Sequence, residues 1–156
     1  MDKERDAPDV AIQPPIALIL ALMAAFIMNW LIPLSFVPTS WPRVEIGLII
    51  LLLALLLIRW SIATLRGAKT GVMIHKPTST IVTSGPYRYT RNPIYIAALL
   101  GLVAFAIGFD SLWFLLMMIA IFLVFHFGVI LREESYLEQK FDGEYLAYKS
   151  KVRRWV

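Results

Sequence analysis

Apolar residues fill four long stretches of the chain, and short polar segments separate them. The stretches run from about residue 16 to 36, 44 to 65, 93 to 108 and 111 to 131. Three of them have the roughly 20 residues that a helix needs to cross a bilayer, and the stretch from residue 93 is shorter. The pattern therefore predicts an all-α integral membrane protein with about four transmembrane helices.

Polar residues modify this pattern in the first stretch. Asn29 and Pro33 lie inside it, and they predict an interhelical hydrogen bond and a kink near the end of the helix. Before it, residues 1–13 mix both signs of charge and are expected to form a disordered polar tail.

After Leu131 the pattern changes from uniformly apolar to amphipathic. Apolar and aromatic residues recur there at spacings of three and four, which predicts a helical tail with one apolar stripe: Leu137, Phe141, Tyr145, Tyr148, Val152 and Trp155. The pair Asp142-Gly143 is expected to break this helix into two pieces.

Composition narrows the class of protein further. Of the 156 residues, 59% are hydrophobic and 17% are charged, which excludes an ordinary soluble domain. The formal net charge of +4 does not point to nucleic acid, because the basic residues cluster beside membrane segments. The absence of cysteine excludes disulfides and thiolate chemistry, and two unpaired histidines argue against a metal site.

The basic residues also predict the orientation in the membrane. The segment 66–92 and the tail after Leu131 hold eleven of the fifteen Lys and Arg residues, whereas the loops on the opposite side hold only Arg43. Cytoplasmic loops are enriched in Lys and Arg, so both basic regions are expected to be cytoplasmic. Four spans then place the N- and C-termini on the cytoplasmic side as well.

Candidate chemistry is concentrated in residues 84–95, SGPYRYTRNPIY, which combine two arginines and three tyrosines. Asn92 suits the N-cap of a helix and Pro93 its first turn, so an arginine-rich loop leads into a helix N-terminus. Topology brings this segment to the same membrane face as the pair Glu133-Glu134. We expect the glutamates to close a pocket against Arg88 or Arg91, although they can also act only as helix-end charges.

The two histidines have different prospects. His126 precedes Glu133 by seven residues, which in a regular helix puts it on the same face and roughly 10 Å deeper. It is either a site residue or a neutral histidine bonded to a backbone carbonyl or to Asn29. His75 lies in the basic segment and is expected to be solvated.

A pocket of this kind suits a zwitterionic ligand. Arginine and a helix N-terminus bind a carboxylate, while glutamates and tyrosine faces bind an ammonium or a sulfonium. A glycine-rich nucleotide-binding loop is missing from the sequence.

Two motifs carry a resemblance to a known family. Residues 85–95, GPYRYTRNPIY, and residues 132–155, REESYLEQKFDGEYLAYKSKVRRW, resemble the isoprenylcysteine carboxyl methyltransferase and phospholipid methyltransferase group of membrane enzymes. The resemblance covers roughly residues 80–156 and implies methyl transfer from S-adenosylmethionine to a membrane-embedded acceptor at the cytoplasmic face. The apolar pattern assigns residues 14–65 to two transmembrane helices, and residues 66–156 are expected to form the catalytic core, with the C-terminal segment enclosing the cofactor.

Site residues follow from the matched motifs. The resemblance implies that Arg91 and one glutamate, assigned here to Glu134, lie nearest the acceptor and are catalytic. It implies that the cofactor is bound by Tyr87, Arg88, Asn92, Pro93, Tyr95, Glu133, Glu134 and Leu137. A prenylcysteine-like carboxylate needs no general base, whereas an amine must lose a proton, to a glutamate or to His126; the sequence leaves both acceptors open.

Four departures from the family pattern are visible: Asn92 replaces histidine, Ala97 replaces glycine, Asp142 precedes Gly143, and no proline follows Trp155. A different class of function also remains open, namely a small four-span transporter or a lipid-binding assembly subunit without catalysis. Such a transporter would want an acidic residue for ion coupling inside its spans, and only Glu45 and Asp110 lie near their edges.

Overall fold

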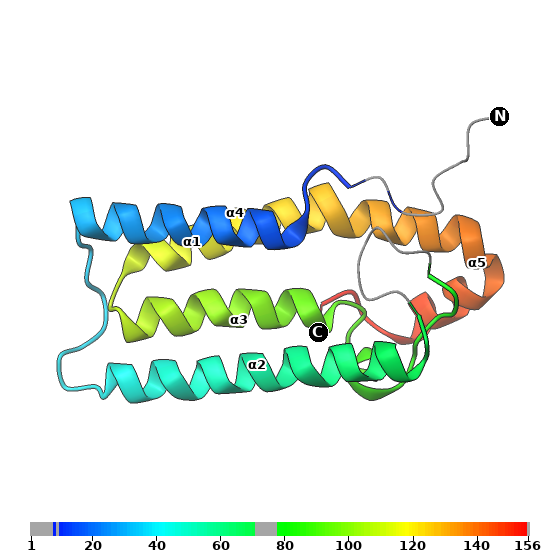
Figure 1. The fold of residues 1–156 in the computed structure, drawn as a ribbon, viewed down its shortest axis with the longest axis horizontal. Coiled ribbons are helices and arrows are strands. Elements are labelled where there is room, and N and C mark those ends of the chain that lie inside the picture. Colours follow the sequence, from blue (N-terminus) through cyan, green and yellow to red (C-terminus); the bar gives the residue numbers. More distant parts are fainter. Residues whose placement is uncertain (1–7, 9, 71–77, 156) are drawn as a thin grey trace.

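The computed structural model describes residue 8 and the ranges 10–70 and 78–155, and the regular structure within them is entirely helical. The elements in chain order are α1 (Pro14–Leu31), α2 (Arg43–Gly67), the short 3-10 helix η1 (Gly85–Arg88), α3 (Pro93–Gly108), α4 (Leu112–Leu123), the π-helix η2 (Val124–Ile130) and α5 (Leu131–Lys151). Because α4, η2 and α5 are continuous, they form one long helix (Figure 1). His75, residues 1–7 and residue 9 lie outside the described residues.

The predicted all-α membrane fold is confirmed. Within the described ranges, α1, α2 and the long helix from Leu112 are long and apolar enough to cross a membrane. The helix α3 has 16 residues and is shorter, as the sequence predicts. The apolar part of the long helix ends at Leu131, where the polar run beginning with Arg132 starts.

Proline residues mark the start of α3 and the end of α1. The helix α3 has the predicted bounds, with Pro93 in its first turn. The helix α1, in contrast, ends at Leu31, so the prediction of a kink at Pro33 within a longer span is wrong. Proline disfavours helical backbone in the residue before it, and Ile32 is accordingly the non-helical end of α1.

Small residues allow α2 and α3 to approach closely, and the two lie side by side in Figure 1. Gly47, Ala54 and Ser61 recur every seven residues on the buried face of α2. A Cβ atom on Gly47 would lie 2.8 Å from the Cα atom of Gly108, so the backbones touch there. Lipid provides no hydrophobic driving force between helices, so the helices are held together by the close van der Waals packing that small residues permit.

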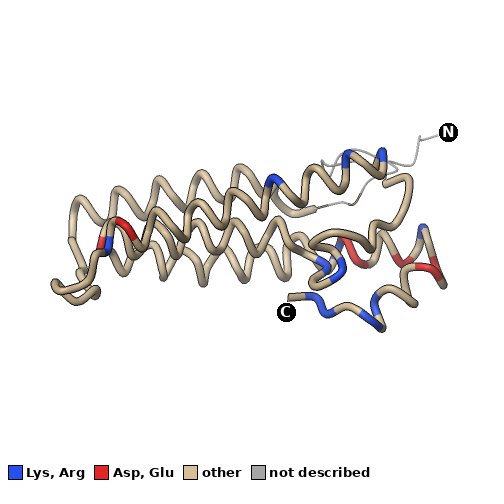
Figure 2. Tube along the Cα trace, turned by 90° about the horizontal axis from the view of Figure 1, so that it is seen from below, with Lys and Arg blue, Asp and Glu red and all other residues tan. Residues whose placement is uncertain are grey.

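The end of the bundle opposite the site is closed by Asp110. Its Oδ1 atom accepts hydrogen bonds from the backbone N–H groups of Phe36 and Val37, and its Oδ2 atom pairs with Arg43 at 2.9 Å. Figure 2 shows that most of the other charged residues gather at the far end of the bundle. The charge asymmetry expected from the sequence is therefore present in three dimensions.

The tail folds back at Asp142, whose φ of 40° and ψ of −118° interrupt α5. The predicted break at Asp142-Gly143 is confirmed. Beyond this kink the chain returns along the bundle, as the red segment in Figure 1 shows, and residues 152–155 reach the start of α3. At the other terminus the N–H of Ala11 donates to the carbonyl of Gly128 in η2.

Candidate active site

The motif at residues 84–95 folds into the turn η1 followed by α3. Gly85 has a φ of +59°, and a Cβ atom there would lie 2.5 Å from Oγ1 of Thr64 in α2. Only glycine combines this conformation with this close approach. The turn buries Tyr87, whose backbone carbonyl accepts a 2.7 Å hydrogen bond from the hydroxyl of Tyr148 in the tail.

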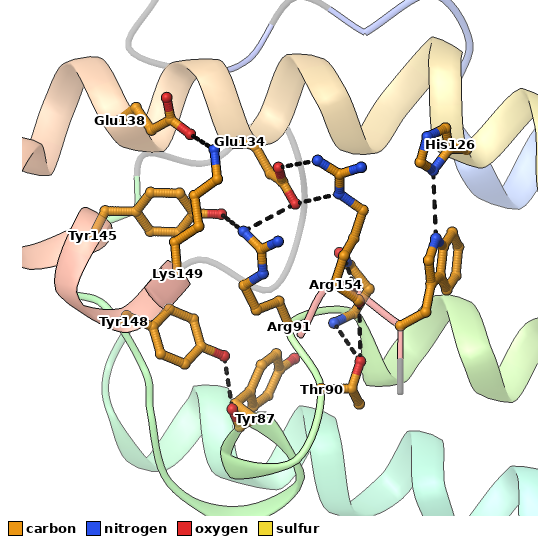
Figure 3. Close-up of polar contacts among 12 residues, drawn as sticks. Tyr87, Thr90, Arg91, His126, Glu134, Glu138, Tyr145, Tyr148, Lys149 and Arg154 are labelled. Carbon is orange, nitrogen blue, oxygen red and sulfur yellow. Dashed lines mark hydrogen bonds and ion pairs between the residues drawn. The ribbon is translucent and has the colours of Figure 1, made fainter. Parts of the chain in front are cut away.

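Glu134 lies at the centre of a buried ion-pair cluster (Figure 3). Arg154 binds its carboxylate through two nitrogens, from Nε to Oε1 and from Nη2 to Oε2, each at 2.8 Å. Arg91 approaches the same Oε1 at 3.2 Å and also donates to the hydroxyl of Tyr145 at 3.4 Å. The carboxylate raises the pKa of Arg154, which therefore stays charged. Of the two arginines expected to meet the glutamates, Arg91 is the one that does.

Asn92 occupies the N-cap position of α3, but its side chain does not cap the helix. Its amide instead donates to the backbone carbonyl of Arg154 at 3.0 Å, and the Thr90 hydroxyl donates to the same oxygen at 3.1 Å. The N–H of Arg91 donates to the carbonyl of Arg153. The asparagine that departs from the family pattern thus fastens the tail to the motif.

Glu133 has different surroundings from its neighbour. It is half-buried, and its Oε1 atom accepts a 2.9 Å hydrogen bond from the Tyr95 hydroxyl. The pKa of the Glu133 carboxyl is raised from 4.5 to about 7, chiefly by burial; the Tyr95 hydrogen bond opposes the rise, and the nearby Glu134 adds to it. The Tyr95 ring packs on Phe125 of η2 with centroids 4.9 Å apart, which fixes the hydroxyl.

These groups surround a cavity of about 460 Å³. It is lined by eight of the nine residues that the motifs single out: Tyr87, Arg91, Asn92, Pro93, Tyr95, Glu133, Glu134 and Leu137. Arg88, the ninth, is exposed and lies outside the cavity lining. Most of the wall comes from residues 66–156, and Leu65 with Pro8, Gln13, Pro14 and Pro15 completes it.

Tyr145 and Tyr148 also line the cavity, and they were not selected from the sequence as site residues. Both belong to the apolar stripe predicted for the tail, in which the matched motifs single out only Leu137 as a site residue. Burial raises the pKa of Tyr145 to about 12, so its hydroxyl stays neutral. The available signal was the presence of two tyrosines, which carry hydroxyl groups, in an otherwise apolar stripe.

His126 lies outside the cavity lining and meets the tail instead. Its Nδ1 atom, as assigned, accepts a 3.4 Å hydrogen bond from Nε1 of Trp155 (Figure 3). The seven-residue spacing to Glu133 assumed a regular α-helix, but the wider turns of η2 lie between the two residues and change their phase. The histidine is hydrogen-bonded, as one interpretation expected, with Trp155 as the partner.

Comparison with known proteins identifies the family. The family model described as phospholipid methyltransferase matches residues 42–144, which is more than half of the chain. The chain belongs to the phospholipid methyltransferase family. It is also 43% identical over 63 residues to an uncharacterized protein of Haemophilus influenzae, an overlap that covers 40% of this chain and all of that protein.

As a phospholipid methyltransferase, the protein is an S-adenosylmethionine-dependent membrane enzyme. Family membership therefore decides against the transporter or non-catalytic subunit. The cavity chemistry fits the cofactor, because its volume lies in the usual range for ligand pockets and its tyrosine faces suit a sulfonium cation. The buried Nε–H of Arg91 has no acceptor within the described part of the chain, which leaves a donor for a ligand carboxylate.

Proposed function

We propose that this phospholipid methyltransferase transfers a methyl group from S-adenosylmethionine to the amine headgroup of a membrane phospholipid at the cytoplasmic surface. The observation that carries the proposal is that residues of both motifs line one cavity, and that these motifs lie at the charged end of the bundle (Figure 2). When bound, the cofactor supplies an electrophilic methyl group. The residues of the chain bind and align the two substrates and exclude water from them.

The tail helps to enclose the site where the two substrates would bind. Its backbone is tied to the motif through Arg153 and Arg154, and Trp155 reaches His126 in the long helix. Methyl transfer is an in-line displacement, so alignment of the reacting atoms and exclusion of water provide much of the rate. In this proposal the ion pair between Arg91 and Glu134 fixes the two motifs relative to each other. Asn92 contributes by holding the tail in place over the site.

The charges of the cavity favour an amine over a prenylcysteine-like carboxylate. Arg91 and Arg154 are both paired with Glu134, whereas Glu133 has no cationic partner among the described residues. The unpaired charge at the wall is thus negative. An ammonium headgroup complements it, while a carboxylate acceptor would lie against a like charge.

A second, smaller cavity supports a lipid as the acceptor. It measures about 150 Å³, its lining is wholly apolar, and it lies between α1, α2 and α3. The same three helices contribute to the charged cavity, one to two turns nearer the headgroup end, through Pro14, Leu65 and Ile94. A phospholipid can therefore place its headgroup in the charged cavity and one acyl chain between these helices.

Cofactor binding is tested by calorimetry with S-adenosylhomocysteine, the product form of the cofactor. Wild type is expected to bind in the micromolar range and Tyr95→Ala to lose binding, because Tyr95 lines the cavity. Tyr89→Ala is the matched control, since Tyr89 belongs to the same motif but is 68% exposed. Absence of binding to well-folded wild type would overturn the proposal.

The predicted orientation can be tested on the same protein. The chain has no cysteine, so single cysteines introduced at Ser150 in the tail and at Thr39 between α1 and α2 report sidedness. A membrane-impermeant thiol reagent added to sealed inverted vesicles, which expose the cytoplasmic face, should label Ser150→Cys and spare Thr39→Cys. The reverse pattern would contradict a cytoplasmic site.

A further inference from the structure

The two adjacent glutamates are held in different ways. Both oxygens of Glu134 are engaged by Arg154, and one of them is also engaged by Arg91. Glu133 lines the same cavity, and its hydrogen bond in the described part of the chain comes from a neutral tyrosine, Tyr95. One carboxylate is therefore locked in ion pairs, and the other is available to a ligand.

We propose that Glu133 is the proton acceptor of the methyl transfer and that Tyr95 is its positioning residue. This inference rests on the proposed function, since only an amine acceptor has a proton to lose. Glu134 is unsuited to the task, because accepting a proton would break two ion pairs. His126 is unsuited because it lies outside the cavity and is bonded to Trp155.

The step balances as follows. The headgroup arrives as an ammonium, and one N–H proton passes to the carboxylate of Glu133. The freed lone pair then forms a nitrogen–carbon bond to the methyl group while the carbon–sulfur bond breaks, and the electrons of that bond remain on sulfur as a neutral thioether. The product is a methylated ammonium, and Glu133 releases its proton to water before the next cycle.

The surroundings of Glu133 match this role. A general base works best when its pKa lies near the operating pH, and the raised pKa of Glu133, about 7, meets this condition better than that of an ordinary carboxyl. The titratable and charged groups lining the cavity around it are Tyr87, Arg91, Tyr95, Glu134, Tyr136, Tyr145 and Tyr148. Arg91 is paired with Glu134, whereas the pKa of Glu133 lies near neutral pH, so Glu133 is the group expected to take up and release the proton.

Tyr95 controls the direction of the carboxylate. Its hydroxyl holds Oε1 of Glu133, and its ring is fixed against the fully buried Phe125. The other oxygen, Oε2, is thereby left for the headgroup. Tyr95→Phe removes the hydroxyl and keeps the ring, so it should shift the titration of Glu133 without removing the base.

The experiment compares wild type, Glu133→Gln, Tyr95→Phe and the control Glu144→Gln, an exposed glutamate on the same helix. In an infrared pH titration without cofactor, wild type and the control should show a carboxyl band that titrates near pH 7. The band should be missing in Glu133→Gln and shifted to higher pH in Tyr95→Phe, because the hydrogen bond favours the charged form.

Kinetics provide the second readout, with phosphatidylethanolamine in nanodiscs as acceptor. Glu133→Gln should lower kcat about 100-fold, with KM and S-adenosylhomocysteine binding changed little. The rise of kcat with pH through neutrality should also disappear. A Glu133→Gln variant with the kcat and pH profile of wild type, or a titrating band that survives this substitution, would overturn the inference. Failure of wild type to bind the cofactor would instead overturn the proposed function.

Discussion

Arg154, which follows the kink in the tail, donates two parallel hydrogen bonds of 2.8 Å each to the carboxylate of Glu134. The contact joins residues 20 positions apart and ties the end of the tail to Glu134, which lines the cavity. Charge-assisted bidentate pairs of this kind are among the strongest polar contacts in proteins, and they impose geometry as well as energy. The ion pair therefore sets the shape of the candidate active site.

Breaking this pair should destabilise the folded enzyme. Glu134→Ala leaves Arg91 and Arg154 unpaired in a buried setting, and we expect a loss of roughly 3 kcal/mol, measured by thermal unfolding in detergent. Arg154→Lys keeps the charge but not the two-point contact and should have a smaller effect. Glu144→Ala, an exposed change on the same helix, is the control. Equal stability of Glu134→Ala and this control would contradict the role of the pair.

Removing the charge of Glu133 should affect stability in a pH-dependent way. Its pKa is raised in the folded state, so its contribution is full below about pH 4.5 and is lost as the pH rises through about 7. Glu133→Gln is neutral at every pH. The variant should therefore gain Tm relative to wild type at pH 8 and differ little at pH 5. A difference in Tm that is the same at both pH values would be inconsistent with the raised pKa.

Local sequence signals located the elements well. Asn92-Pro93 and the Gly108-Phe109-Asp110 turn mark both ends of α3, and the two motifs were correctly brought to one place by topology. The kink at Asp142 was also visible, although it is Asp142 that adopts the positive φ there.

The contacts that complete the site were not visible in the sequence. The hydrogen bond from Asn92 to the tail, the pairing of Arg154 with Glu134 and the contact of Trp155 with His126 join residues far apart in the chain. Their geometry depends on the fold-back of the tail and on the π-helix η2, neither of which has a periodic signature. Helix phase calculated without η2 placed His126 wrongly.

Gly85 should be intolerant of substitution. Gly85→Ala adds a Cβ atom at a positive φ and against Thr64, and we expect a loss of about 2 kcal/mol. Gly143→Ala is the matched control, because a Cβ atom there meets nothing within 4 Å and no positive φ is involved. Gly85→Ala should have a lower Tm and weaker S-adenosylhomocysteine binding than Gly143→Ala. Similar behaviour of both would show that η1 does not need its close packing on α2.

Filling the apolar cavity should reduce activity on a long-chain phospholipid more than activity on a short-chain one. A Cβ atom on Gly101, which lines this cavity, meets nothing within 4 Å, so Gly101→Leu is expected to fold and to occupy the space. Methylation of a long-chain phospholipid should fall about tenfold or more, while a short-chain analogue and S-adenosylhomocysteine binding are spared. Equal losses on both acceptors would argue against an acyl chain between α1, α2 and α3.

The most direct test of the whole account is to find where a labelled methyl group goes. Purified wild type in nanodiscs is incubated with methyl-labelled S-adenosylmethionine, phosphatidylethanolamine and a prenylcysteine analogue, and the products are identified by mass spectrometry. The account predicts label on the headgroup nitrogen of the phospholipid, with Glu133→Gln strongly reduced and Glu144→Gln unchanged. Label on the prenylcysteine carboxylate, or none on either acceptor, would contradict it.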